Sequence, residues 1–390
     1  MGKPKDQFLL AFADRVRSYK SMMHVRHVVR QFYPAIGGLE DATANLVREL
    51  ARQGVGGSVL TLNRRFSDPH TILPANEDYN GIPVARIPYS GSSRYPVAPS
   101  VLQYLSGADI VHVHGIDFFF DFLAVTKAIH HKPLVASTHG GFFHTKFASR
   151  AKKIFFQSIT RLSARNYDRI FGSSESDAAM FRKIAPRSTV TVENGVNIDK
   201  WRSAASLNIT RTMIFIGRFS RNKNIPALIR LVAALGSNWR LIIAGQPSDL
   251  SESDLRAEAS RLDVIDRVEV VTGPDDLGLH ALIGRASYIA SASQYEGFGL
   301  SVVEGMSAGL TPILSDIPPF KRLVANSRRG LIVDMNSPMQ AASAVQAWHD
   351  TQLANARNEN IASVQAFSWS GVATEFAAHY RAVLAARSST

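Results

Sequence analysis

Short runs of apolar residues recur along the chain, each ending in a glycine-containing or polar loop, and most are followed by a helix pattern. The first such pattern covers residues 39–52, where Leu39, Ala42, Leu46 and Leu50 fall on one face of a helix. Alternating buried strands and helices are typical of parallel α/β architecture. The predicted strands are residues 24–29, 58–62, 110–114, 134–138, 169–174, 190–194, 212–219, 239–245, 268–273, 287–293 and 311–315.

These strands form two successive sets, and 390 residues are too many for one ordinary core. The sequence therefore predicts two Rossmann-like domains, each a doubly wound parallel sheet, facing each other across a cleft. We expect the first over residues 1–195, the second over 196–366, and a C-terminal helix over 367–390 that crosses back to the first domain. Ligands of such sheets bind outside the carboxyl ends of the strands.

One segment, residues 296–304, combines two carboxylates with two glycines at the start of a helix-forming run. Gly297 and Gly299 leave the backbone N–H groups open to a ligand, and a helix beginning near Leu300 adds its positive dipole end. A carboxylate repels phosphate, so Glu296 and Glu304 are better suited to accept hydrogen bonds from hydroxyl groups. The segment predicts a site for a diphosphate with a sugar on each side, as in a nucleotide sugar.

Two cations follow the first strand of the second domain. Arg218 and Lys223 lie on a loop that leads into a helix at Pro226, where they can clamp a diphosphate and stabilise a leaving nucleotide. No Asp-x-Asp pair occurs in the chain, which favours a metal-free mechanism. The alternative is that both are ordinary solvated surface charges.

The first domain offers a second glycine pair and a histidine after a strand. Gly37 and Gly38 precede a helix and can present backbone donors to phosphate, although a plain tight turn is an equal alternative. His139 follows the strand over 134–138, where its imidazole projects from the carboxyl end. A metal site of His112, His114, His139 and His144 is disfavoured for lack of a carboxylate or thiolate partner, and His112 is expected in the interior.

Charge is concentrated in the first half of the chain. Residues 1–190 hold 25 Lys and Arg against 14 Asp and Glu, and the remainder hold 19 against 18. Basic and aromatic side chains alternate over residues 142–169, which suits either an anionic membrane surface or a solvated face over a core stripe. Nucleic-acid binding rests on net charge alone. The chain has no cysteine and its N-terminal apolar run, 8–13, is too short to span a bilayer, so a cytoplasmic protein is expected.

Several motifs together resemble the retaining glycosyltransferases of family 4, which have the GT-B fold. They are the loop with Gly37 and Gly38, HVHG and STHGG around His114 and His139, ENG at 193–195, GRFSRNKN at 217–224, and the two-glutamate segment. More narrowly, HVVRQFYPAIGGLE, SSRYPVAPS and LSDIPPFKRL are similar to segments of the mannosyltransferases of xanthan-type and acetan-type exopolysaccharide assembly.

The resemblance implies α-transfer of mannose from GDP-mannose to a cellobiose carried on a polyprenyl diphosphate, at the inner face of the cell membrane. It implies that His139, Lys223 and Glu296 act at the reacting sugar and that no metal or other cofactor is needed. A UDP-sugar donor or another acceptor stays open, and a paired-carboxylate glycosidase is disfavoured because the glycines and cations would then have no use. The resemblance assigns donor contacts to Gly37, Gly38, Arg218, Lys223, Phe298, Gly299, Leu300 and Glu304.

Overall fold

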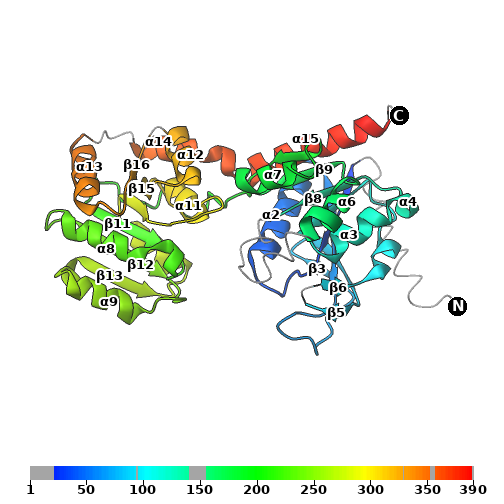
Figure 1. Ribbon diagram of the computed structural model, residues 1–390, viewed down its shortest axis with the longest axis horizontal. Helices are drawn as coiled ribbons and strands as arrows, with labels where there is room; N and C mark the ends of the chain where they lie inside the picture. The colour runs from blue at the N-terminus through cyan, green and yellow to red at the C-terminus, as the bar shows by residue number, and fades with distance from the viewer. Residues whose placement is uncertain (1–21, 94, 140–154, 328, 352–355, 389–390) are drawn as a thin grey trace. The chain divides into compact units, whose positions relative to one another are not determined.

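The computed structural model divides the chain into two compact units, each a sheet flanked by helices (Figure 1). Unit 1 comprises Met1–Gly195 and Trp369–Thr390, and unit 2 comprises Val196–Ser368. The structure describes residues 22–93, 95–139, 155–327, 329–351 and 356–388.

Unit 1 is built on an eight-stranded sheet in the order β10-β9-β8-β7-β1-β2-β4-β3. All neighbouring pairs are parallel except β3 and β4, which are antiparallel at the edge. The order reverses between β1 and β7, so the topological switch point lies there. The strands are β1 (His24–Val29), β2 (Gly56–Leu62), β3 (Asn76–Tyr79), β4 (Ile82–Ile87), β7 (Ile110–His114), β8 (Leu134–Ser137), β9 (Arg169–Gly172) and β10 (Thr189–Thr191), with a separate hairpin of β5 (Ser90–Ser92) and β6 (Tyr95–Val97).

The helix at the C-terminus belongs to the core of unit 1. Val372, Phe376 and Tyr380 of this helix pack with residues of β1, β7 and β9 in one buried cluster. Trp369 sits so close to Gly195 that a side chain at that glycine would clash with its indole ring. The helices of unit 1 are α2 (Gly38–Arg52), α3 (Phe118–Val125), α4 (Lys127–His130), α6 (Arg161–Ala164), α7 (Glu175–Arg182) and α15 (Trp369–Ser388), with a 3₁₀ helix η1 (Pro99–Tyr104) and a π turn η2 (Phe156–Thr160).

Unit 2 has a fully parallel six-stranded sheet in the order β13-β12-β11-β14-β15-β16. This is the strand order of a dinucleotide-binding fold, with its switch point between β11 and β14. The strands are β11 (Thr212–Ile216), β12 (Arg240–Gly245), β13 (Val268–Thr272), β14 (Tyr288–Ser291), β15 (Thr311–Ser315) and β16 (Leu331–Val333).

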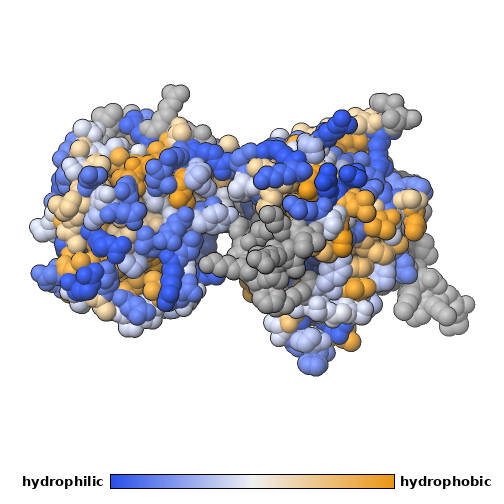
Figure 2. Space-filling view, in the orientation of Figure 1, coloured by the Kyte–Doolittle hydropathy of each residue, from blue (hydrophilic) through white to orange (hydrophobic). Residues whose placement is uncertain are grey.

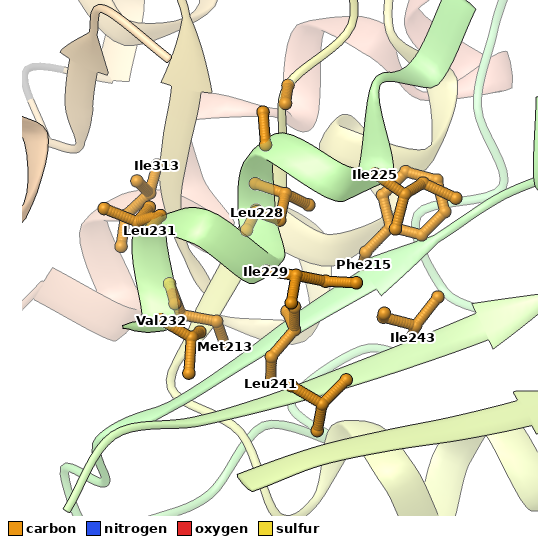
Figure 3. Close-up of a cluster of buried hydrophobic side chains, with 14 of the residues drawn as sticks. Met213, Phe215, Ile225, Leu228, Ile229, Leu231, Val232, Leu241, Ile243 and Ile313 are labelled. Carbon is orange, nitrogen blue, oxygen red and sulfur yellow. The ribbon is translucent and has the colours of Figure 1, made fainter. Parts of the chain in front are cut away.

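Helices cover the sheet of unit 2 by burying apolar stripes. Figure 3 shows α8 lying on β11 and β12, with Leu228, Ile229 and Val232 directed toward Met213 and Leu241. The helices of unit 2 are α8 (Ile225–Ala234), α9 (Glu252–Arg261), α10 (Asp276–Ile283), α11 (Leu300–Ala308), α12 (Pro318–Ser327), α13 (Pro338–Asp350) and α14 (Ala356–Ser363), with 3₁₀ turns η3 (Arg221–Lys223), η4 (Ile265–Arg267) and η5 (Gln365–Phe367).

The predicted parallel α/β architecture is confirmed, and each predicted strand is present with its ends shifted by no more than a few residues. The sequence did not predict five strands. Four of them are short or polar, such as β3, which reads NEDY, and β16, which has three residues. The fifth, β4, reads IPVARI and is buried at five of six positions, so an apolar strand was also missed. Across the described residues, no helix combines the length and the apolar character needed to cross a bilayer.

Candidate functional site

The carboxyl ends of β11 and β14 bring the predicted donor residues of unit 2 together. Lys223 lies on η3 after β11, and Glu296 lies on the loop after β14. The two loops are joined by hydrogen bonds from Gln294 N to Asn222 O at 2.9 Å and from Asn222 Nδ2 to Tyr295 O at 2.8 Å. Because β11 and β14 are the switch-point strands, this is where a doubly wound sheet binds its ligand.

Lys223 and Glu296 form an ion pair through Nζ and Oε1. The two side chains are only 20% and 16% exposed. The Ser293 hydroxyl donates to the same Oε1 at 2.8 Å, so two donors hold one oxygen of this carboxylate. Among the described residues, Oε2 has no hydrogen-bond partner, which leaves it able to accept a hydrogen bond from a ligand.

Arg218 lies next to the start of this loop with an exposed side chain. Its guanidinium makes no hydrogen bond or ion pair with any described residue. The five donors of a free guanidinium match the oxygens of a diphosphate. The predicted pair of cations is therefore present at the carboxyl end of β11, one held by a carboxylate and one open.

The two-glutamate segment begins a helix as predicted. Gly299 is the residue before α11, with φ 97°, and a Cβ there would lie 2.8 Å from the Phe320 ring. Phe298 is buried and meets Phe367 edge to ring at 5.1 Å, whereas Leu300 is 47% exposed. The side chain of Phe298 therefore anchors the turn, and its backbone and that of its neighbours remain the groups that can meet a ligand.

Glu304 lies one turn into α11, and burial raises the pKa of its carboxyl to about 7. The nearby Lys200 ammonium opposes this rise, and Asp276 adds to it. Lys200 and Asp276 are themselves paired at 2.7 Å. No described residue hydrogen-bonds the Glu304 carboxylate, so both oxygens can take hydroxyl donors.

In unit 1, Gly37 and Gly38 lie at the start of α2, with Gly37 as the capping residue in extended conformation. A Cβ on Gly37 would lie 2.6 Å from the Glu40 carboxylate, whereas one on Gly38 would meet nothing within 4 Å. Burial raises the pKa of Glu40. The open approach to this helix start is therefore at Gly38.

His139 lies two residues after the end of β8, with a left-handed φ of 52°. It lines a pocket at the carboxyl ends of β8, β9 and β10, together with Ser137, Ser173, Asn194 and Trp369. Ser174, beside Ser173, is the capping residue of α7 and accepts a hydrogen bond from Asp177 N at 3.2 Å.

His112 is fully buried, as predicted. Of the histidines considered as metal ligands, His144 lies outside the described residues. A different trio, His27, His112 and His114, has ligand atoms within 4.8 Å of one another. Both nitrogens of His112 are already hydrogen-bonded, to Tyr380 and to Ser137 at 2.7 and 2.8 Å.

The basic segment is described only in part, because residues 140–154 lie outside the described residues. The described part is exposed at Ile159, Arg161, Leu162 and Arg165.

The sequence pattern did not indicate Ser293, Lys200 or Asp276 as site residues. Of these, Ser293 carries a weak sequence signal, a hydroxyl three residues before Glu296 in a loop.

Two family models cover most of the chain. Residues 36–200 match the model Glycosyltransferase Family 4, and residues 198–363 match Glycosyl transferases group 1. The chain is 45% identical to the GDP-mannose:cellobiosyl-diphosphopolyprenol alpha-mannosyltransferase of Xanthomonas oryzae pv. oryzae, over 93% of this chain and 97% of that enzyme. It is 44% identical to the enzyme of that name from Komagataeibacter xylinus, over 93% of this chain and 94% of the relative.

Solved structures show the same architecture. Sucrose-phosphate synthase from Thermosynechococcus elongatus superposes with a TM-score of 0.68 at 19% identity, covering 93% of this chain and all of that one. At such low identity the structural similarity shows the fold alone, and this fold is GT-B. With the two family models and the close relatives, the predicted resemblance is confirmed, and the chain belongs to the family 4 glycosyltransferases.

Proposed function

We propose that this glycosyltransferase moves mannose from GDP-mannose, with retention, to a cellobiose carried on a polyprenyl diphosphate. The observation that carries the proposal is 44–45% identity over 93% of the chain to enzymes named for this reaction. The geometry of unit 2 supports it, because an ion pair, an open guanidinium and a glycine-led helix meet at the switch point of a nucleotide-binding sheet.

In this proposal each group of unit 2 has one task. Arg218 and Lys223 bind the diphosphate and stabilise the charge that develops as the nucleotide leaves. The backbone of Phe298, Gly299 and Leu300 donates to phosphate oxygens. Glu296 accepts hydroxyls of the transferred mannose through its open Oε2, and Glu304 accepts those of the ribose. Gly37, Gly38 and His139 supply the contacts of unit 1 to phosphate and sugar.

The transfer step needs no enzymic nucleophile in this proposal. The bond from the sugar's anomeric carbon to the acceptor oxygen forms on the face from which the phosphate oxygen departs, and the acceptor's proton passes to that leaving phosphate. Glu296 suits hydroxyl binding better than nucleophilic attack, because Lys223 and Ser293 already hold one of its oxygens. The cations of the loop after β11 take the role a metal has elsewhere.

Mass analysis of the product tests the reaction. The full chain is offered GDP-mannose with cellobiosyl-diphospho-lipid, and the expected product is heavier by one hexose and sensitive to α-mannosidase. Matched reactions with UDP-glucose, and with GDP-mannose in excess EDTA, test the donor and the metal. Transfer from UDP-glucose in preference to GDP-mannose, or activity lost in EDTA and restored by magnesium, would contradict the proposal.

We also propose that unit 1 binds an anionic lipid surface. Figure 2 shows hydrophobic residues at the surface of unit 1 over α3 and α4. Val125, Ile129 and Leu162 are 73%, 70% and 61% exposed, and Arg161 and Arg165 on and beside α6 are exposed near them. α6 packs on α3, so these side chains share one surface. Exposed apolar residues beside cations suit a headgroup layer.

Flotation with anionic vesicles tests this surface. Changing Ile129 and Leu162 to Glu should release the protein from vesicles, because both side chains are exposed and the fold does not depend on them. Met339→Glu on α13 is the matched control, since Met339 is 71% exposed on unit 2 and should not affect binding. Unchanged flotation of the double variant would exclude this surface.

A further inference from the structure

A chain of hydrogen-bonded imidazoles runs through unit 1 and ends at His139. His27 Nδ1 lies 2.9 Å from His114 Nε2, and His114 Nδ1 lies 2.9 Å from His139 Nε2. The first two rings belong to the adjacent strands β1 and β7, at the switch point of this sheet, and the third follows β8. Two side chains from strands and one from the loop after a third strand are therefore linked through both nitrogens of the middle ring.

The two ends of this chain differ in their surroundings. His27 Nε2 is buried and has no hydrogen-bond partner among the described residues. His139 Nδ1 also has no partner in the described part of the chain, but His139 is not fully buried and lines the pocket with Ser137 and Ser173. Among the described residues, one end is closed inside the core, and the other reaches a pocket.

Neutral imidazoles in such a chain must all donate their hydrogen bonds in the same direction along it. Each ring has one N–H and one bare nitrogen, so a proton on Nδ1 of His27 requires a proton on Nδ1 of both His114 and His139. The opposite direction places every proton on Nε2 and buries the N–H of His27 without an acceptor. Buried N–H groups without a partner are rarer than buried acceptors without one. The first direction is therefore favoured.

We propose that His27 and His114 are positioning residues that hold His139 in the tautomer with its hydrogen on Nδ1, so that His139 presents an N–H donor to its ligand. The ligand atom would be an oxygen that accepts, such as a sugar hydroxyl oxygen. The identity of that ligand rests on the proposed function, whereas the tautomer does not. Burial lowers the pKa of His139 to about 4, which keeps the donor neutral at physiological pH.

A metal ion on His27, His112 and His114 is the competing use of these rings. Each metal ligand must offer a bare nitrogen. Both nitrogens of His114 are in the chain, and both of His112 are bonded to Tyr380 and Ser137. A metal would therefore break at least two buried hydrogen bonds, whereas the chain uses them all.

The direct test is the tautomer of His139 in the full chain without substrate. Long-range proton–nitrogen spectra of protein labelled with ¹⁵N-histidine distinguish the protonated from the bare ring nitrogen, and His139→Gln assigns the signal. We expect the hydrogen on Nδ1. A hydrogen on Nε2, a charged ring at pH 7, or stoichiometric bound zinc by elemental analysis would each overturn the proposal, whatever the enzyme's substrate is.

Variants then test the linkage. His27→Phe keeps an aromatic ring and removes the N–H that donates to His114. His139 should then populate both tautomers. We expect kcat/KM to fall about tenfold, which corresponds to the loss of one hydrogen bond. His27→Asn can still donate from its amide to His114 and should restore both readouts. His112→Phe is the matched control from the same sheet face, with the His139 tautomer unchanged. If His27→Phe leaves the His139 spectrum as in the parent protein, the chain does not orient His139.

Discussion

The ion pair of Lys223 and Glu296 joins the two loops of unit 2 at the candidate site. It is less exposed than the surface pair of Arg285 and Glu269, whose side chains are 54% and 42% exposed. In the free protein the pair balances its own charge. In the proposed complex, Lys223 gains the diphosphate as a second anion, and Glu296 binds the sugar through its open Oε2. The proposed pair thus sorts the two halves of one ligand by charge.

Removing either member should stop transfer with little effect on folding. We expect Lys223→Met and Glu296→Gln each to lower kcat by about 100-fold or more, the range measured for a lost charge-stabilising group. The free energy of unfolding should fall by only about 1–2 kcal/mol, because both groups keep some contact with water. Arg285→Ala is the control, and steady-state kinetics with urea unfolding are the measurements. Parent-like turnover in either variant would remove the pair from the site.

Nucleotide binding should depend on the protonation of Glu304. The carboxylate form accepts two hydroxyls, and the protonated form does so less well. Since burial places the pKa near 7, GDP should bind more weakly as pH falls from about 8 to 6. Titration calorimetry across this range tests it. Glu304→Gln should bind GDP weakly at every pH. Its affinity should show no step near pH 7 beyond the change that the phosphate of GDP itself causes. The same step in Glu304→Gln would assign the titration elsewhere.

At this scale the sequence predicted residue types better than partners. Glu296, Lys223 and His139 stand out because each follows a recognisable strand. Lys200 and His27 do not stand out, because they lie 104 and 112 residues along the chain from Glu304 and His139, the groups that they influence. Contacts of that separation depend on the strand order, which an isolated sequence pattern does not contain.

The start of α11 shows how an element positions a site. Gly299 adopts φ 97°, a conformation open to few residues other than glycine, and it packs against Phe320. Gly297, two residues earlier, has an ordinary φ and open space around the place of a Cβ. The two glycines of one motif therefore differ in what the fold demands of them. Gly299 is required by the turn, whereas nothing in the described part of the chain requires Gly297.

Substituting each glycine separates folding from ligand approach. Gly299→Ala should lower the free energy of unfolding by about 1–3 kcal/mol, from backbone strain and the contact with Phe320. Gly297→Ala should leave it within about 0.5 kcal/mol, yet raise the KM for GDP-mannose if the ligand's phosphate lies against this backbone. Chemical unfolding and donor kinetics measure the two effects. Equal loss of stability in both variants would contradict the assigned roles.

Among elements, most apolar runs were predicted, whereas β4 and the short edge strands were not. The run over β11, TMIFI, is buried at four of five positions, which no surface segment would be. β3 has an exposed centre and pairs only with β4, so its strand character comes from its neighbour. Periodicity reports burial, and an edge strand with little burial leaves almost no trace in the sequence.

Across the whole molecule, histidines with a lowered pKa are distributed unequally between the two units. Burial lowers the pKa of seven described histidines of unit 1. The shift is large for five of them: His24 and His139 to about 4, His27 to about 3, and His112 and His114 well below 6.5. The pKa values of His130 and His379 are lowered as well. In the described part of unit 2, His349 is the one histidine with a lowered pKa. Unit 1 must therefore bury neutral imidazoles that the unfolded chain would protonate in mild acid.

Unit 1 should consequently unfold in acid before unit 2. A histidine with a lowered folded pKa binds its proton only when unfolded, so its contribution to stability is present above 6.5 and is lost as pH falls toward the folded pKa. Near pH 5.5 the five histidines with the large shifts should lower the free energy of unfolding of unit 1 by several kcal/mol per pH unit, at about 1.4 kcal/mol for each proton. Asp117, whose pKa burial raises to about 6, opposes this with one proton.

Pulse-labelling hydrogen exchange during urea unfolding reads peptides of the two units separately. Between pH 7 and 5 the midpoint for β7 and β8 should fall steeply. The midpoint for β11 and β12 should change little, because the proton that Glu304 binds more tightly in the folded state offsets the one that His349 binds more tightly in the unfolded state. His112→Asn, if it folds, should flatten the slope of unit 1 by about one proton. Parallel loss of both units would show that the buried histidines are not the acid-sensitive groups.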